Sequence, residues 1–133
     1  MSSIFSKIIA REIPGHFVFE DEHCVVLMDK FPAVPGQTLV VPKQETDYLF
    51  SLEDDLYQHL CGVAKRVARA SDIVFKTVRT CMVVEGFEVP HVHLRLYPMT
   101  STEHGLGQVM VQQAEAADET LAEQAKAIAA VME

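Results

Sequence analysis

The 133-residue sequence predicts an α+β fold with a five-stranded, mainly antiparallel sheet. Short runs rich in β-branched residues occur first as a group of three and later as a group of two, and turn residues separate them. Segments with apolar residues at helical spacing precede, separate and follow these groups. Strands grouped in this way favour antiparallel pairing over the singly alternating pattern of a parallel α/β sheet. A chain of this length is expected to form a single domain over residues 1–133.

The first part of the chain predicts one helix and three strands. Residues 3–12 predict a short amphipathic N-terminal helix, which Pro14-Gly15 ends. Residues 17–21 and 23–29 are β-rich runs that predict a hairpin. After a proline-punctuated loop, residues 37–43 predict the third strand.

The middle of the chain predicts a long central helix that begins after Ser51. Ser51 and Asp54 have the spacing of a capping box, which satisfies free backbone N–H groups at the start of a helix. Apolar residues then recur at helical spacing along one face: Leu56, Leu60, Val63, Val67 and Val74. Residues 80–86 and 90–98 predict the fourth and fifth strands.

The last part of the chain predicts an added C-terminal helix over residues 110–132. Its apolar stripe is rich in alanine and suits close packing on a sheet, a helix or a partner: Met110, Ala114, Ala117, Leu121, Ala125, Ile128 and Val131. Residues 101–133 are therefore interpreted as an extension of a domain core over about residues 3–98. This extension contains six acidic residues and one lysine, so it supplies −5 of the net charge of −8.

The composition excludes several classes of function. A net charge of −8 argues against general nucleic-acid binding, which depends on lysine and arginine neutralising phosphates. The apolar stretch near the N-terminus is short and broken by polar residues, so neither a signal peptide nor a membrane span is expected. Three scattered cysteines without CxxC spacing predict reduced thiols in a cytoplasmic protein. The chain is therefore expected to bind neither nucleic acid nor membrane.

The stretch PHVHLRLYP, residues 90–98, is the most informative part of the sequence. In a strand, one face of this run carries four polar side chains: His91, His93, Arg95 and Tyr97. Three interpretations are open, namely chemistry on a phosphate ester, a metal site and a solvated polar face. A metal site needs a third ligand, and three other histidines are candidates for it: His16, His23 and His104.

HVHLRLYP resembles the histidine-triad (HIT) motif, in which three histidines alternate with apolar residues, but Arg95 stands in place of the third histidine. Two further segments resemble the same family: D-x-x-P from Asp29 to Pro32, and PG-x-T-L-V-V-P-K from Pro35 to Lys43. EGFEVPHVHLRLYP is similar to a branch of small bacterial HIT proteins with a shortened loop before the triad. The order of helices and strands resembles the family from about residue 3 to residue 98, which implies a HIT-like fold.

The resemblance implies a nucleotidyl hydrolase or transferase that acts on the α-phosphate of a nucleotide conjugate. The conjugate is expected to be of the dinucleoside polyphosphate or nucleoside phosphoramidate type. In the family, the middle histidine of the motif forms a nucleotidyl-histidine intermediate, and this role falls on His93. His91 is then expected to orient His93, and Arg95 is expected to contact phosphate oxygens and the leaving group.

The resemblance also implies a binding site for a purine nucleotide or nucleotide conjugate. Asp29 matches the acidic residue that receives ribose hydroxyls, with Leu27 and Met28 near the base. On the sequence alone, Asp29 is explained equally well as the residue that starts a turn before Phe31-Pro32.

Two further candidate contacts to the substrate depart from the family pattern. Gln37 stands where relatives often have histidine, and it can hydrogen-bond a phosphate oxygen or a histidine but cannot carry a proton. Glu88 stands where relatives often have Ser or Thr touching a phosphate. A carboxylate there is unfavourable unless it is protonated, pairs with Arg95 or points away.

No metal or other cofactor is expected. Many bacterial relatives bind a structural zinc ion through an N-terminal CxxC, a histidine after the P-K pair and the first histidine of the triad. Here Ser3 and Ser6 replace the cysteines and Glu45 replaces the histidine, which leaves only His91. Packing of four apolar side chains is then expected to hold the first helix: Ile4, Phe5, Ile8 and Ile9.

Arg95 also affects the chemistry that is expected. An arginine keeps its charge and cannot donate a proton to a leaving amine, but it can stabilise charge on a pentavalent transition state. We therefore expect slow hydrolysis, with polyphosphates better substrates than phosphoramidates. The alternative is a catalytically weakened nucleotide-binding or dimeric interaction protein of the family. The resemblance implies a homodimer in either case.

Overall fold

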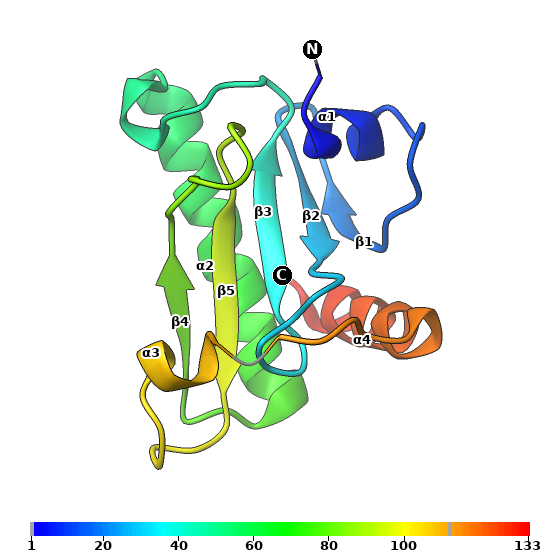
Figure 1. Ribbon diagram of the computed structural model, residues 1–133, viewed down its shortest axis with the longest axis vertical. Coiled ribbons are helices and arrows are strands. Elements are labelled where there is room, and N and C mark those ends of the chain that lie inside the picture. Colours follow the sequence, from blue (N-terminus) through cyan, green and yellow to red (C-terminus); the bar gives the residue numbers. More distant parts are fainter. Residues whose placement is uncertain (1, 112) are drawn as a thin grey trace.

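The computed structural model describes residues 2–111 and 113–133 and contains a five-stranded sheet in the order β1-β2-β3-β5-β4 (Figure 1). The strands are β1 (Phe17–Glu20), β2 (Cys24–Met28), β3 (Thr38–Pro42), β4 (Arg79–Val83) and β5 (Leu94–Met99). The helices are α1 (Ile4–Ile9), the 3₁₀ helix η1 (Leu49–Ser51), α2 (Asp54–Phe75), α3 (Leu106–Val109) and α4 (Asp118–Val131). Every pair of neighbouring strands is antiparallel, so the predicted α+β class and sheet are confirmed.

Helices cover both faces of the sheet. The short helix α1 lies on one face, and α2 and α4 lie on the other (Figure 1). Two apolar cores result, a smaller one under α1 and a larger one under α2 and α4. The side chains of β2 alternate between them, with Val25 and Leu27 toward α1 and the others toward α2 and α4. This division explains why every residue of β2 and β3 is buried.

The long central helix is confirmed, but it begins differently from the prediction. Ser51 ends η1, where its hydroxyl donates to the Tyr48 carbonyl at 2.8 Å. α2 begins at Asp54, after the extended residue Glu53, whose side chain makes no capping bond. The predicted capping box is therefore wrong. Instead, the acidic side chains of Asp54 and Asp55 favour the start of the helix through its dipole.

The apolar stripe of α2 packs on the sheet of its own chain. Leu60, Val63 and Val67 are buried in the larger core, and α2 contacts β3, β4 and β5. The central part of the predicted stripe is therefore used within the protein and is not available to a partner.

The predicted C-terminal helix over residues 110–132 is wrong in its first part. The short helix α3 ends before the predicted start, and α4 begins only at Asp118. The backbone N–H of Ala116 donates to the Lys30 carbonyl at 2.9 Å, and the Lys30 side chain forms an ion pair with Glu115 at 3.3 Å. Because this N–H is used by the β2–β3 loop, the helix begins after it.

α4 contributes to the larger core. Leu121, Ala125 and Ile128 are buried, whereas the predicted stripe residues Ala114 and Ala117 are exposed. The helix contacts α2, β1 and β2. The C-terminal segment therefore packs against the sheet and the central helix.

The fifth strand begins later than predicted. β5 starts at Leu94, so His91 and His93 lie on the segment that leads into it. The Val92 N–H donates to the Thr46 carbonyl at 2.7 Å, which attaches this segment to the chain between β3 and α2. The alternation nevertheless crosses the boundary, because the larger core takes three alternate residues: Val92, Leu94 and Leu96.

The structure also bears on the classes of protein that the composition excludes. Within residues 2–111 and 113–133, none of the helices combines the length and the apolar composition needed to cross a bilayer. Cys24, Cys61 and Cys81 are free thiols, and Cys24 is fully buried. The cytoplasmic location and the lack of nucleic-acid binding stay predictions.

Candidate active site

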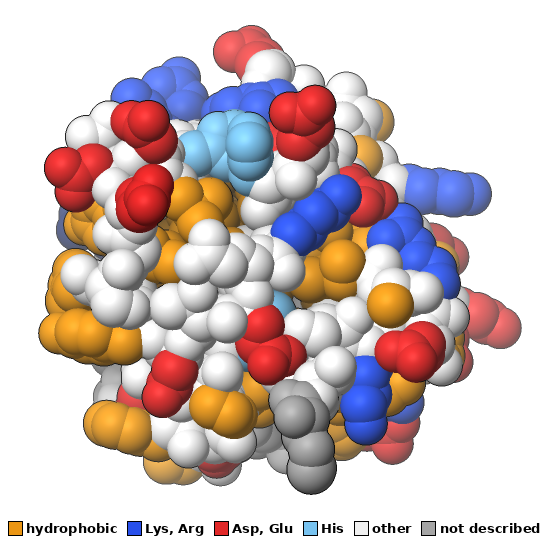
Figure 2. Space-filling view, turned by 90° about the horizontal axis from the view of Figure 1, so that it is seen from above, with side chains coloured by type: hydrophobic (Ala, Val, Ile, Leu, Met, Phe, Trp, Pro, Cys, Tyr) orange, Lys and Arg blue, Asp and Glu red, His pale blue; other side chains and the backbone are white. Residues whose placement is uncertain are grey.

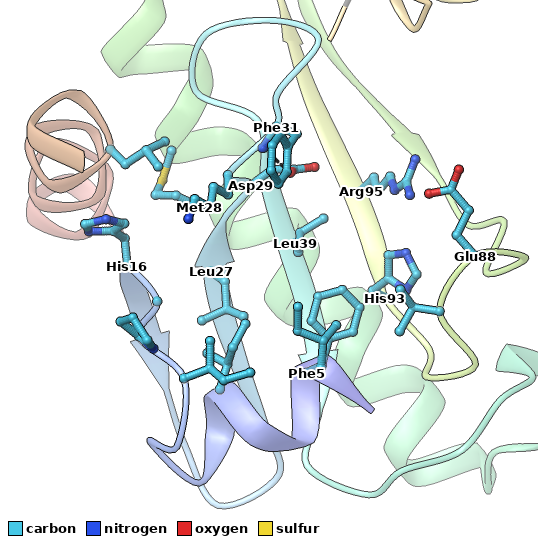
Figure 3. Close-up of a pocket in the computed structure, with 18 of the residues that line it drawn as sticks. Phe5, His16, Leu27, Met28, Asp29, Phe31, Leu39, Glu88, His93 and Arg95 are labelled. Atoms are coloured by element: carbon cyan, nitrogen blue, oxygen red, sulfur yellow. Dashed lines mark hydrogen bonds between the residues drawn. The ribbon is translucent and has the colours of Figure 1, made fainter. Parts of the chain in front are cut away.

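A cavity of about 740 Å³ lies between α1 and the sheet (Figure 3). Its lining comes from α1 and the segment after it, from β2 and the loop after β2, from β3, from the chain around the start of β5, and from the first turns of α4. Six of the predicted site residues line it: Leu27, Met28, Asp29, Glu88, His93 and Arg95. The other two, Gln37 and His91, are buried and hydrogen-bond to lining residues from behind.

His93 is held in one orientation by its surroundings. The residue is buried, and its ring lies against that of Phe5 with the ring centroids 4.8 Å apart. Its Nδ1 lies 2.7 Å from the backbone carbonyl of His91. Because a carbonyl oxygen only accepts hydrogen bonds, Nδ1 carries the hydrogen of the neutral ring. Nε2 is then the ring nitrogen with the lone pair. Burial lowers the pKa of His93, and the Arg95 charge also lowers it, so Nε2 keeps its lone pair at neutral pH.

His91 is buried behind His93 and uses both of its ring nitrogens. Its Nε2 lies 2.8 Å from the Pro42 carbonyl and donates to it. Its Nδ1 lies 2.6 Å from the Ser3 hydroxyl, which donates to it when the ring is neutral. The ring is thereby fixed between the end of β3 and the start of α1. This position aligns the His91 carbonyl with His93.

Ser3 belongs to a hydrogen-bond network that holds α1 against the sheet. Its hydroxyl caps the helix by accepting from the Ser6 N–H at 3.0 Å. The Glu45 carboxylate accepts from the Ser3 N–H at 2.7 Å and from the Ser6 hydroxyl at 2.6 Å. These bonds lower the pKa of Glu45 to about 2. We refer to Ser3, Ser6 and Glu45 as the N-terminal clasp.

The N-terminal clasp changes the expected account of how α1 is held. The sequence predicts attachment by four apolar side chains, but their burial is uneven. Phe5 is buried, Ile8 and Ile9 are half-buried, and Ile4 is 48% exposed. Hydrogen bonds therefore share the attachment of α1 with packing. The residues that form these hydrogen bonds are the ones that the sequence comparison places where zinc-binding relatives have their ligands.

Arg95 and Glu88 bring opposite charges to the same side of the cavity (Figure 3). Burial opposes the charge of Arg95, but the hydroxyl of Tyr97 and the carboxylates of Asp29 and Glu88 raise its pKa. The guanidinium is therefore a permanent cation beside His93. Glu88 faces the cavity with its carboxylate toward Arg95, so its charge is directed at that cation.

Asp29 is fixed by two bonds at the end of β2. One carboxylate oxygen accepts from the Phe31 N–H at 2.9 Å, and the other accepts from the Gln37 side-chain amide at 2.6 Å. The Gln37 oxygen in turn accepts from the Ala33 N–H at 2.7 Å. Asp29 thus starts the turn and also lines the cavity. Gln37 supports Asp29 from within the loop and does not itself line the cavity.

A metal site built on His91 and His93 gains no support. Both ring nitrogens of His91 are already hydrogen-bonded to protein groups. Within the described ranges, the one group of side chains with metal-ligand spacing includes neither histidine. Of the candidate third ligands, His16 lines the cavity, whereas His23 and His104 are not part of its lining.

Some cavity residues carry no functional signal in the sequence. Phe5, expected only as a packing residue, contacts His93. Asp118 and Leu121 of α4 line the cavity, and Asp118 pairs with His16 at 3.0 Å. His16 and Asp118 are 102 positions apart, so no local pattern connects them. The capping role of Ser3 has a local signal, because serine is a preferred residue before the first turn of a helix.

Comparison with known proteins identifies relatives over most of the chain. The model of the HIT domain matches residues 10–102. A HIT-like protein of Methanocaldococcus jannaschii is 36% identical over 102 residues, which cover 71% of this chain and 77% of that protein. The adenosine 5'-monophosphoramidase of Saccharomyces cerevisiae is 30% identical over 104 residues, which cover 77% of this chain and 66% of that protein.

The similarity in structure extends further than the matched sequence. The crystal structure of a HIT-like protein from Bartonella henselae has a TM-score of 0.85 and 26% identity to this chain. The superposition covers 97% of this chain and 95% of that one. From the domain match over residues 10–102 and the shared fold, we conclude that the chain belongs to the HIT family.

Proposed function

We propose that this HIT protein is a nucleotide hydrolase or nucleotidyl transferase in which His93 attacks the α-phosphate of a nucleotide conjugate. One observation carries the proposal, namely the 2.7 Å contact between His93 Nδ1 and the His91 carbonyl. This contact commits Nδ1 and leaves Nε2 with a free lone pair on a residue that lines the cavity. An imidazole nitrogen is a better nucleophile than water and divides one difficult displacement into two.

The proposed reaction has two steps. In the first, His93 Nε2 forms a bond to phosphorus, and the bond to the leaving group breaks with its electron pair going to that group. The hydrogen stays on Nδ1, where the His91 carbonyl stabilises the positive charge that develops on the ring. In the second, water or another acceptor attacks phosphorus, the P–N bond breaks, and the acceptor releases its proton to solvent. The imidazole then returns to its neutral state.

The substrate class follows from the lining of the cavity. Leu27 and Met28 offer an apolar surface for a purine base. Asp29, oriented by Gln37, would accept hydrogen bonds from ribose hydroxyls. The Arg95 guanidinium, on the side of the cavity that His93 occupies, would bind phosphate oxygens.

The leaving group depends on Arg95, which by resemblance takes the position of the third triad histidine. The relative from Saccharomyces cerevisiae is an adenosine 5'-monophosphoramidase, so an adenosine phosphoramidate serves as the reference substrate. Arginine can stabilise charge on a departing polyphosphate but cannot protonate a departing amine. We therefore expect diadenosine polyphosphates to react faster than phosphoramidates, and the reverse order would contradict this assignment of Arg95.

Intact-protein mass spectrometry, after brief mixing without acid, tests the nucleophile. Wild-type protein mixed with adenosine phosphoramidate or a diadenosine polyphosphate should show a transient mass increase of one adenylyl group. His93→Ala should show neither this mass nor product. His104→Ala, at an exposed histidine that is not part of the cavity lining, should behave as wild type. A wild type without adduct and without product would refute the enzymatic function.

A second candidate function is nucleotide binding without turnover. The Glu88 carboxylate in the cavity favours it, because it repels the phosphate oxygens that Arg95 attracts. A binder should melt at a higher temperature with nucleotide and form no product. A protein that acts only as a dimeric interaction module should show neither effect.

The homodimer implied by the family is proposed to form along β4. This strand lies at an edge of the sheet, where its free backbone groups can pair with a second copy. Apolar side chains are exposed on it and beside it: Val78, Met82 and Val84. Light scattering at micromolar concentration should give a dimer for wild type and for Val111→Arg, but a monomer for Met82→Arg. A monomeric wild type would refute the dimer.

A further inference from the structure

A cluster of metal-ligand side chains lies near the start of α2. It combines Asp21 in the turn between β1 and β2, Cys24 at the start of β2, and His59 on α2. One ligand atom from each residue lies within 4.8 Å of the other two. Cys24 faces the larger core under α2, whereas the cavity and His93 lie on the α1 side. Figure 2 views the molecule from this end and shows a histidine surface bordered by acidic and basic side chains.

The turn between β1 and β2 holds the Asp21 carboxylate in one orientation. Its Oδ1 accepts from the backbone N–H groups of His23 and Cys24, at 2.8 and 2.9 Å. Its Oδ2 lies 2.7 Å from His59 Nε2. A carboxylate that is fixed by two backbone bonds needs little reorganisation to act as a ligand.

The residues that follow Asp21 supply two further donor groups, from Cys24 and His23. The thiol of Cys24 is fully buried and closes the inner side of the cluster. The ring of His23 is exposed and lies 5.1 Å from the ring of His59, centroid to centroid. The side chains of Asp21 and His59 are 25% and 36% exposed, so an ion can enter from solvent.

The chemistry of these donors indicates the kind of ion. Thiolate and imidazole ligands suit Zn²⁺ and Co²⁺, whereas Mg²⁺ and Ca²⁺ require oxygen ligands. One thiolate and one carboxylate neutralise the two positive charges of the ion, which favours binding in a partly buried position. Tetrahedral bonds to zinc of about 2.0–2.3 Å place two ligand atoms roughly 3.3–3.8 Å apart. Asp21 Oδ2 and His59 Nε2, now 2.7 Å apart in a hydrogen bond, would therefore separate to admit the ion between them.

We propose that Asp21, Cys24 and His59 bind a divalent ion of the zinc class, with His23 as the fourth ligand. On binding, the Cys24 thiol releases its proton to solvent and its sulfur bonds to the metal. The hydrogen that His59 Nε2 directs at Asp21 Oδ2 is replaced by the ion: Nε2 gives up this proton to solvent, Nδ1 takes up a proton from solvent, and the freed Nε2 lone pair binds the metal. The bound ion ties the β1–β2 hairpin to α2 and stabilises the fold.

This site is distinct from the zinc position of HIT relatives. The expectation that no metal binds is based on the loss of that set of ligands, where the N-terminal clasp now stands, and the proposed site departs from that expectation. Asp21 and His59 are 38 positions apart in the sequence, so their spacing does not match any short metal-binding motif. The inference is independent of the proposed reaction at His93.

Cobalt(II) added to the untagged, metal-free full chain is the direct probe. One equivalent of Co²⁺ should give a near-ultraviolet charge-transfer band from a thiolate ligand, together with visible bands of a tetrahedral ion. Excess Zn²⁺ should abolish both. Cys24→Ser should lose the charge-transfer band, and His59→Gln should bind Co²⁺ at least about tenfold more weakly.

Matched variants outside the cluster serve as controls. Cys61→Ser and His104→Gln remove the same kinds of side chain and should keep the cobalt spectrum. His93→Ala should keep it too, which separates this site from the active site. A wild type without a thiolate band overturns the proposal, as does a band that survives Cys24→Ser. If circular dichroism shows that Cys24→Ser does not fold, the weaker binding expected of His59→Gln decides, and unchanged affinity overturns the proposal.

Discussion

Two backbone carbonyl groups determine how the histidines of the site can act. The Pro42 carbonyl accepts from His91, and the His91 carbonyl accepts from His93. Each ring therefore has one nitrogen committed to the backbone. The second nitrogen of His91, Nδ1, is hydrogen-bonded to Ser3, whereas the second nitrogen of His93, Nε2, is left for a ligand in the cavity. Two histidines that look alike in the sequence thus have different tasks.

Replacing Glu45 by glutamine should change the acid stability of the protein. Hydrogen bonds from Ser3 and Ser6 lower the pKa of Glu45 from 4.5 to about 2 in the folded state. Between these values the unfolded chain binds a proton at Glu45 and the folded chain does not, so stability falls as the pH drops from about 4.5 to about 2. Denaturant unfolding across this range should show a shallower loss for Glu45→Gln than for wild type.

A matched control for the acid effect is Glu123→Gln on the exposed side of α4. It should leave the wild-type dependence on pH unchanged. Identical pH profiles for Glu45→Gln and wild type would show that the Glu45 charge contributes nothing to the acid dependence of stability.

At the scale of elements, the loop between β2 and β3 connects the cavity to α2. Gly36 in this loop has a φ of +84°, and a Cβ there would lie 2.4 Å from the ring of Phe75 at the end of α2. Glycine therefore allows the loop to pass over the helix end. The next residue, Gln37, then reaches Asp29 and orients it toward the cavity.

The variant Gly36→Ala should be destabilised by strain and by the clash with Phe75. A left-handed backbone and an overpacked contact together should lower the free energy of unfolding by about 2–4 kcal/mol. Gly62→Ala is the matched control, since Gly62 lies within α2 and a Cβ there meets nothing within 4 Å. It should raise stability by roughly 0.5–1 kcal/mol. Urea unfolding measures the free energy of unfolding of both variants. An equal change in the two would contradict the assigned role of Gly36.

At the scale of the whole molecule, the sheet separates the candidate active site from the larger apolar core. The α1 face carries the cavity with His93, and the opposite face carries the packing of α2 and α4. α4 takes part in both, because Leu121 belongs to the larger core and also lines the cavity. The acidic C-terminal segment is thus connected to the site through its packing.

Truncation of a buried side chain in α4 should therefore reduce the stability of the whole domain. Ile128 is fully buried, and Ile128→Ala should lower the free energy of unfolding by about 2–4 kcal/mol. Val111 is 79% exposed, and Val111→Ala should change stability by no more than about 0.5 kcal/mol. A single unfolding transition should persist in both variants. An unchanged stability for Ile128→Ala would mean that α4 is not part of the cooperative unit.

The sequence by itself determined the strands, the central helix and the face on which the site forms. These features depend on periods of two and of 3.6 residues, which are visible in neighbouring positions. The alternation from Val92 to Leu96 thus assigned His93 and Arg95 to one side of the sheet before any contact was known. Resemblance to the HIT motif then identified Asp29 as a cavity residue.

Only the tertiary structure decided the features that depend on contacts between distant residues. α4 starts at Asp118 because the β2–β3 loop takes the N–H of Ala116. The orientation of His91 depends on Ser3, which is 88 positions away. Such hydrogen bonds leave no periodic trace in the sequence, because each depends on where the whole chain brings two groups together.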